Sequence, residues 1–225
     1  MQNRELICPI CSPHYSLHYA KQQLMPNPAT FFRLPKTLFI ALVSLILAAC
    51  QTYNTTSDGK VDNLMLQGHD PVAFFTEGRA VKGKDALTAK YEVGSYYFTS
   101  EANRAAFAAA PAKYAPQFGG FCTDGAAFDM KAGGEVSTFK VYKDKLYIFG
   151  GRGAYEAWAL NADLNLQRGD AYWKDGLKEA NAKLSFYKRL IFRVPHYKSG
   201  AALAEEVAAR KKAGTFPVLP GAGAQ

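Results

Sequence analysis

A short apolar segment near the start of the sequence divides the 225-residue chain into two parts with different roles. Residues 38–49 are apolar apart from one serine, and Arg33 and Lys36 precede them. The run is too short to cross a bilayer as a helix, which takes about 20 residues. A short apolar core with a positive flank is typical of a secretory signal peptide. We therefore expect residues 1–49 to be a targeting signal, and the fold to be formed by the residues after position 49.

The apolar segment ends in Leu-Ala-Ala-Cys, with the cysteine at position 50, which resembles the lipobox of bacterial lipoproteins. Cleavage of a lipobox leaves the cysteine at the new N-terminus with lipid attached, so the resemblance implies lipidation of Cys50. Such an anchor holds a protein at a membrane without spanning it. Gln51 follows in place of Asp, which by analogy with lipoprotein sorting implies the outer membrane, facing the periplasm. The alternative is an ordinary secretory signal whose cleavage happens to precede Cys50.

The segment before Met25 is not needed for a signal peptide of normal length, so we expect translation to begin at Met25. It contains four zinc-type ligands, Cys8, Cys11, His14 and His18. Their spacing does not match a zinc finger, which needs a longer loop between the two pairs. The cysteine pair also lacks the strand–helix context of a redox motif. Either site would be removed with the signal.

The composition of the remaining chain excludes several classes of protein. It holds 23 Lys and Arg against 18 Asp and Glu, a formal net charge of +5. No basic run exceeds three residues, so a nucleic-acid partner is not expected. A mild affinity for anionic surfaces is expected instead. Its thiols and imidazoles beyond Cys50 are few, namely Cys122, His69 and His196.

Short strand-like and helix-like segments alternate after residue 60. Hairpins are predicted over 88–99 and 137–149, and a short apolar strand over Val72–Phe75. The expected helices are 101–110 capped by Ser100, a helical turn from Pro111, 155–160, 169–188 and 201–212. Mixed strands and helices with hairpins predict an α+β fold: a small domain with two β-hairpins and short helices, plus a helical C-terminal extension.

The sequence also predicts five segments along the chain. They are the signal with its upstream part (1–49), the lipidated cysteine and a polar tether (50–63), the α+β domain (64–150), a helical extension (151–190) and a basic, partly loose tail (191–225).

The α+β domain resembles the YHS domain family. The resemblance is carried by Gly-His-Asp-Pro-Val-Ala-Phe-Phe at 68–75, where members usually have Tyr for the His and for the first Phe, by 96–104 with Phe107, and by 111–122. It covers residues 64–150 and implies a small α+β domain found in secreted or membrane-attached proteins. Metal binding is suspected for the family because some members carry cysteines in this region.

This chain departs from the cysteine-rich members of that family. Thr99 and Asn103 stand near the places where those members have cysteines, and Cys122 alone is kept. A single thiolate without a second soft ligand is a poor site for zinc or copper(I). The departure weakens a transfer of metal binding from the family to this chain.

Four residues are nevertheless candidate metal ligands. If a transition metal ion is the cofactor, Cys122 as thiolate and His69 as imidazole would bind it, with Asp124 or Asp129 next. The alternatives are that Cys122 is a buried small hydrophobe, that His69 fills an aromatic place, and that both carboxylates are solvated.

A small-ligand site is the second candidate for the same region. Asp70 could orient His69, and Tyr97 and Phe121 could line a pocket. The alternatives are that Asp70 caps the turn before Pro71 and that the aromatic rings belong to the core.

Two functions remain in view. One is a lipid-anchored periplasmic protein that binds a metal ion or small ligand without catalysis, near Cys122 and His69. The other is an envelope-anchored interaction module or accessory subunit that docks a protein partner and holds no metal. No catalytic triad, phosphate loop or dinucleotide fingerprint is found, so an enzyme is not expected. Convergence of Cys122 with His69 would favour the first function, whereas a sealed Cys122 and an exposed aromatic patch would favour the second.

Overall fold

The first sheet is built on the earlier of the two predicted hairpins. A computed structural model describes residues 53–223, all within one compact unit of the chain. The strands of this sheet, in spatial order, are β1 (Thr55–Thr56), β2 (Leu64–Met65), β4 (Gly94–Phe98) and β3 (Lys84–Tyr91). The β3–β4 and β1–β2 pairs are antiparallel, and the β2–β4 pair is parallel. The expected tether over 50–63 thus contributes β1 to the fold.

The second sheet consists of the other predicted hairpin. Its strands β5 (Glu135–Tyr142) and β6 (Lys145–Phe149) pair antiparallel. Side chains of β6 alternate between two hydrophobic clusters: Leu146 and Ile148 pack with the first sheet, whereas Tyr147 and Phe149 pack with the later helices. The hairpin is therefore buried on both faces.

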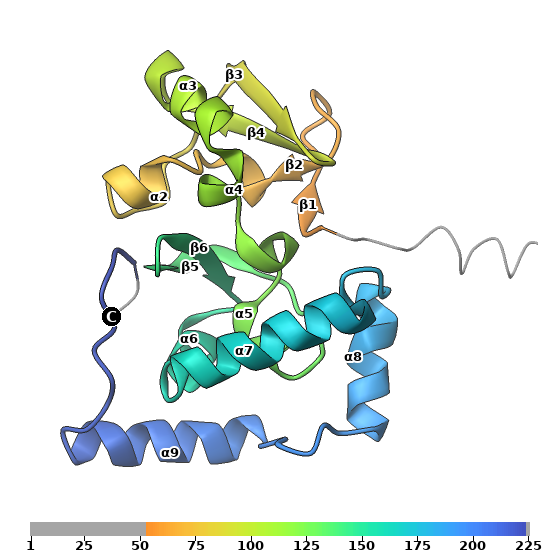
Figure 1. Cartoon of the computed structure of the whole chain (residues 1–225), viewed down its shortest axis with the longest axis vertical. Helices are drawn as coiled ribbons and strands as arrows, with labels where there is room; N and C mark the ends of the chain where they lie inside the picture. The colour runs from red at the N-terminus through yellow and green to blue at the C-terminus, as the bar shows by residue number, and fades with distance from the viewer. Residues whose placement is uncertain (1–52, 224–225) are drawn as a thin grey trace, which may run out of the picture. The chain divides into compact units, whose positions relative to one another are not determined.

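Helices surround the two sheets (Figure 1), and the combination confirms the predicted α+β fold. The α-helices are α2 (Ala73–Thr76), α3 (Glu101–Ala109), α4 (Pro111–Tyr114), α5 (Thr123–Ala127), α6 (Arg152–Ala159), α7 (Ala162–Tyr172), α8 (Ala182–Ile191) and α9 (Gly200–Lys212). The short 3₁₀ and π segments are η2 (Leu66–Gly68), η3 (Gln117–Gly120) and η4 (Trp173–Leu177). The predicted cap of α3 is confirmed, because the Ser100 hydroxyl accepts a hydrogen bond from the Asn103 amide at 3.1 Å.

The strand predicted at Val72–Phe75 is wrong, since α2 begins at Ala73 with Val72 as its N-cap. The Thr76 and Glu77 amides donate to the Val72 and Ala73 carbonyls, which closes helical turns. A run of four apolar residues has no period that distinguishes a strand from a buried helix.

The single helix predicted over 169–188 is also wrong. The chain leaves helical geometry at Asp175 and Gly176, where the glycine has φ +111°. A new helix, α8, begins after Asn181, whose side chain accepts a hydrogen bond from the Leu184 amide. The apolar spacing continues across the break, so periodicity alone could not locate it.

The segment expected to be loose near the end of the chain pairs with β5. The Val141 amide donates to the Ala222 carbonyl at 2.8 Å, and Lys140 forms a β-bridge with Gly223. The Lys140 ammonium group, on a buried residue, donates to the Gly221 carbonyl at 2.8 Å. Residues 221–223 therefore cover the edge of β5.

We expect Gly223→Ala to destabilise the fold because an added Cβ would lie 2.3 Å from the Phe139 carbonyl oxygen. The matched control is Gly176→Ala, which has nearly the same φ (+111° against +110°) but no atom within 4 Å of the added Cβ. Both changes strain the backbone by about 1 kcal/mol, and the clash should cost Gly223→Ala roughly 1–3 kcal/mol more in urea denaturation. Equal losses would contradict the pairing.

Candidate functional site

Asp70 is a structural residue at the centre of a hydrogen-bonded network. It is fully buried, and its Oδ1 accepts from the Val72 amide at 2.8 Å. Its Oδ2 accepts from the Thr99 amide (2.8 Å), the Thr99 hydroxyl (2.7 Å) and the Asn103 side-chain amide (2.7 Å). The carboxylate thus joins the turn before α2 to the end of β4 and the start of α3. Thr99 and Asn103 serve to hold it.

His69 lies beside this network at the edge of the first sheet. The half-buried ring contacts the Leu66 carbonyl through Nδ1 at 2.9 Å, and since a carbonyl can only accept, Nδ1 carries the proton. Burial lowers the pKa of His69, helped by the charge of Lys82. The imidazole is therefore neutral near pH 7, with the lone pair on Nε2.

Cys122 is sealed in the interior. It is 3% exposed, forms a parallel bridge with Ile148 and packs against Gly150. Burial, and next the nearby Asp124 carboxyl group, raise the pKa of Cys122 to about 11. The group is a thiol rather than a thiolate at neutral pH, and a thiol is neither a good metal ligand nor a good nucleophile.

Asp124, in α5, has an unusual carboxyl group. Its Oδ1 is buried without a hydrogen-bond partner among the described residues. Burial raises the pKa of Asp124 to about 7. The acid is thus partly protonated at neutral pH, which suits an apolar setting better than the first coordination shell of a cation.

Asp129 belongs to a different set of contacts. Its carboxylate forms an ion pair with the largely buried guanidinium of Arg189 on α8, and lies 3.8 Å from the Lys188 ammonium group. The Arg189 Nε also donates to the Asp129 carbonyl at 3.3 Å. Asp129 therefore fixes α8 against the loop after α5.

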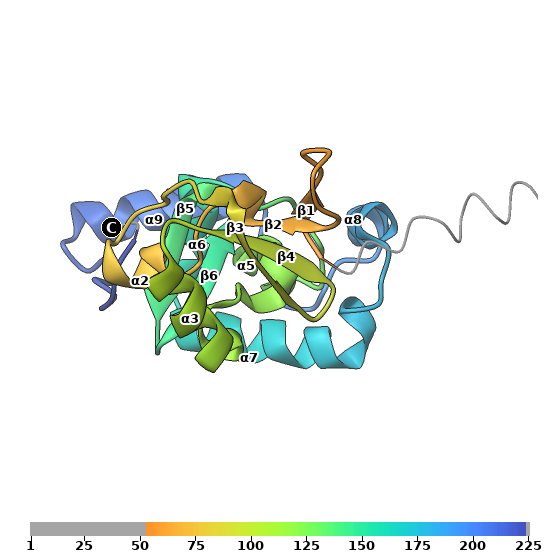
Figure 2. The same cartoon turned by 90° about the horizontal axis from the view of Figure 1, so that it is seen from above.

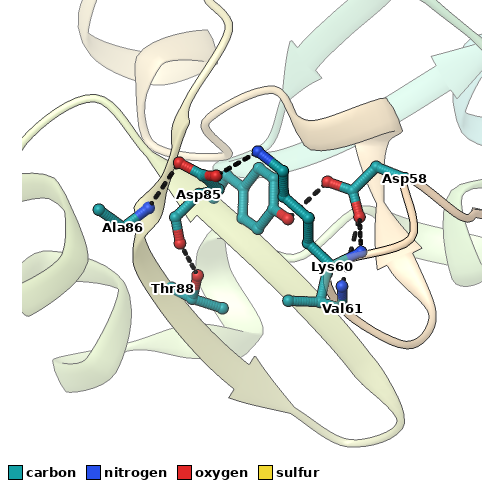
Figure 3. A network of polar contacts seen from close by, with 7 residues as sticks. Asp58, Lys60, Val61, Asp85, Ala86 and Thr88 are labelled. Carbon is teal, nitrogen blue, oxygen red and sulfur yellow. Dashed lines mark hydrogen bonds and ion pairs between the residues drawn. The ribbon is translucent and has the colours of Figure 1, made fainter.

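Tyr97 uses its hydroxyl group inside the protein. The ring is buried, and the hydroxyl donates to Asp58 at 2.6 Å. This hydrogen bond, more than burial, raises the pKa of Tyr97 to about 12. Figure 3 shows the surrounding network, in which Asp58 accepts from the backbone amides of Lys60 and Val61, and Lys60 pairs with Asp85 on β3. Tyr97 thus ties the loop before β2 to the sheet.

Phe121 is likewise a core residue. It is buried, and the Lys131 ammonium group lies 5.3 Å from its ring centroid. That buried lysine also donates to the Lys178 and Ala180 carbonyls, at 2.7 Å each. The contacts join the loop after α5 to the segment that leads into α8.

The predicted ligands do not gather into a metal centre. Within residues 53–223, no three His, Cys, Asp or Glu side chains lie together in a way that could hold a metal ion. Cys122 and Asp124 are close to each other, whereas His69 contacts the Leu66 carbonyl and Asp129 pairs with Arg189 on α8. Cys50, the predicted lipidation site, lies outside the described residues.

The feature that sequence reasoning missed is the outward side of α8. Six large apolar side chains there are between 42% and 75% exposed, and we call them the α8 apolar face: Leu184, Phe186, Tyr187, Leu190, Ile191 and Phe192. Their spacing in the sequence looks like that of a core-facing stripe. The signal that could have revealed them is the polar pair Ser185 and Arg189, four residues apart on the opposite side.

No helix within residues 53–223 combines the length and the apolar composition needed to span a membrane.

We expect Asp70→Ala to lower the free energy of unfolding by about 3 kcal/mol or more. Hydrogen bonds to charged groups contribute about 1.5–3 kcal/mol each, and the change leaves buried donors unpaired. Urea denaturation measures the loss, and Asp62→Ala on the exposed loop is the control. A loss below about 1 kcal/mol, as for a typical surface change, would show that the network is dispensable.

We expect Asp124→Asn to be more stable than the parent chain at pH 8. The folded-state pKa of about 7 lies above the ordinary 3.8, so the folded state holds the proton more tightly. The stability that this group contributes is therefore lost as pH rises from about 4 to about 7. Above pH 7 the buried carboxylate is charged, and the fold remains destabilised by it. The gain at pH 8 should be on the order of a few kcal/mol and vanish near pH 4.

Urea denaturation across this pH range tests the expectation, with Asp62→Asn as a control that should leave the pH profile unchanged. A gain for Asp124→Asn that is independent of pH would refute the assignment of the titration to this group.

Comparison with known proteins adds no relative: no family model, curated protein or solved structure matches the chain. The resemblance to the YHS domain family stays a prediction.

Proposed function

We propose that this chain is a non-catalytic docking module of the YHS type, held in the bacterial envelope by lipid on Cys50. The proposal places it at the outer membrane, facing the periplasm. The observation that supports it best is the α8 apolar face. A surface helix normally turns its apolar side to the core, and contiguous exposed apolar side chains mark interaction sites.

Polar contacts on the inner side fix the rotation of α8. The Ser185 hydroxyl accepts from the Lys131 backbone amide at 3.1 Å and donates to the Ala182 carbonyl at 2.8 Å. The Arg189 guanidinium pairs with Asp129 on the same side. Turning the apolar side inward would break these contacts, so the outward face is built into the fold.

The segment after α8 is held as well. His196 contacts the Ala127 carbonyl through Nε2 at 2.8 Å, and its ring lies 5.3 Å from that of Phe128. Val194 is buried. Contacts hold both the inner side of α8 and the segment that follows it. The α8 apolar face is therefore a defined surface rather than one conformation of a free segment.

The metal-binding alternative has less support. It needs a thiolate at Cys122, and burial raises the pKa of that thiol to about 11. It also needs His69 close to Cys122, whereas the His69 ring is engaged at the Leu66 carbonyl. The docking function requires neither residue as a ligand.

A labelling experiment on the full-length chain in intact envelopes tests the docking function. We expect Leu190→Cys to react with a small maleimide several-fold more slowly than Val93→Cys, because a partner covers α8. Val93 is the matched control, since it is 55% exposed and lies in the turn between β3 and β4. Cys122 is buried and should contribute little background.

Urea should then make the two variants react equally, which shows that the difference comes from the folded, docked state. If Leu190→Cys reacts as fast as Val93→Cys in the envelope, the α8 apolar face is uncovered and the docking function is wrong.

A further inference from the structure

We propose that the α8 apolar face docks on the surface of an anionic phospholipid bilayer. This inference rests on the proposed docking function and names its partner. Three observations carry it: the charges around α8, their arrangement relative to the apolar side chains, and the short distance along the chain to the anchoring cysteine.

The charge around α8 is uniformly positive in sequence. Residues 180–204 contain no Asp or Glu and five basic residues, which are Lys183, Lys188, Arg189, Arg193 and Lys198. Arg189 is neutralised by Asp129, and Lys198 by Glu206 on α9. Three cations therefore remain for a partner, namely Lys183, Lys188 and Arg193, all of them exposed. Lys188 lies 3.8 Å from Asp129, yet its side chain is 60% exposed.

The lysines share the outward side with the apolar residues. At about 100° per residue, Lys183, Tyr187 and Leu190 point the same way, and Lys188 lies at the margin next to Leu184. Aromatic and aliphatic side chains interleaved with lysines are typical of helices that lie in a membrane interface. The lysine stems can extend so that the ammonium groups reach the phosphates while the apolar groups enter the acyl boundary.

The anchor would hold this surface close to the bilayer. The chain is attached to the folded body at Tyr53, which packs against the first hydrophobic cluster, and at Asn54. The Asn54 amide donates to the Gly119 carbonyl at 2.8 Å, and its side chain donates to the Gly120 carbonyl at 3.0 Å. Only residues 51–53 separate Asn54 from Cys50. Four steps of about 3.5 Å reach about 14 Å, so a lipid on Cys50 would press the body against the membrane.

The side that would face the membrane includes α8. Figures 1 and 2 both show α8 on the same side of the body as β1, where the described chain begins. A second attachment through α8 would therefore need no rearrangement of the fold. A protein partner would have to fit between this side and the bilayer, which the short tether disfavours.

Vesicle experiments test the inference with the full chain in which Cys8, Cys11 and Cys50 are changed to Ser, so that the dye attaches to the introduced cysteine. An environment-sensitive fluorophore is attached to Leu190→Cys, and the protein is added to vesicles of phosphatidylcholine with or without phosphatidylglycerol. We expect a blue shift, and quenching by brominated acyl chains, with phosphatidylglycerol and much less without it. The same dye on Val93→Cys should report water in both. The readout does not require lipid on Cys50, because an unacylated chain is added from solution.

Charge variants separate anionic lipid from general apolar binding. Lys183→Gln and Lys188→Gln should each reduce the docked-to-free ratio roughly fivefold on phosphatidylglycerol vesicles. Lys84→Gln and Lys90→Gln on β3 are the matched controls, since both lysines are exposed, and should change nothing.

The outcomes distinguish this inference from the function it rests on. A dye at position 190 that reports water on phosphatidylglycerol vesicles overturns the lipid partner, as does an equal blue shift on both vesicle types. If Leu190→Cys is still protected in envelopes, the cover is a protein or another copy of the chain, and the docking function stands. If Leu190→Cys is unprotected in envelopes, both proposals fail.

Discussion

The β5–β6 hairpin is the element on which the other parts of the fold depend. Both of its faces are buried, one under the first sheet and α3, the other under α6 and α7. Its edges are used as well: residues near Pro116 and Cys122 bridge β6, and residues 221–223 cover β5. A two-stranded ribbon is marginal alone, so this one is stable because every side of it is packed.

A chain with a small sheet buried on both faces has few places for a polar site in its interior. Two of its buried polar side chains hold elements together: Asp70 joins β4 to α3, and Lys131 joins the loop after α5 to the segment before α8. The feature that remains unexplained by packing is on the surface, namely the exposed apolar side chains of the α8 apolar face. This distribution is consistent with the proposed docking function.

Local signals account for what could be predicted. Gly94 lies between two β-rich runs, and Ser100 precedes a helix-forming run, so the hairpin and the capped helix could be inferred from neighbouring residues. The predictions that failed depend on distant partners. Asp129 meets Arg189 sixty residues later, and the apolar spacing alone does not reveal that α8 turns its apolar side outward. Cys122 could be assigned to the core or to a site only once its neighbours were known.

The edge of β5 is covered by residues 221–223, which are among the last to be synthesised. The hairpin is therefore protected only late in translation. Lys140 bonds to Gly221, 81 positions further along. Until that part has been synthesised, the edge of β5 offers free amides and carbonyls, and such an edge invites pairing with another chain. A nascent chain would benefit from a chaperone during this interval. Cleavage before residue 221 would reopen the edge, so a trimmed form should be more prone to aggregate than an intact one.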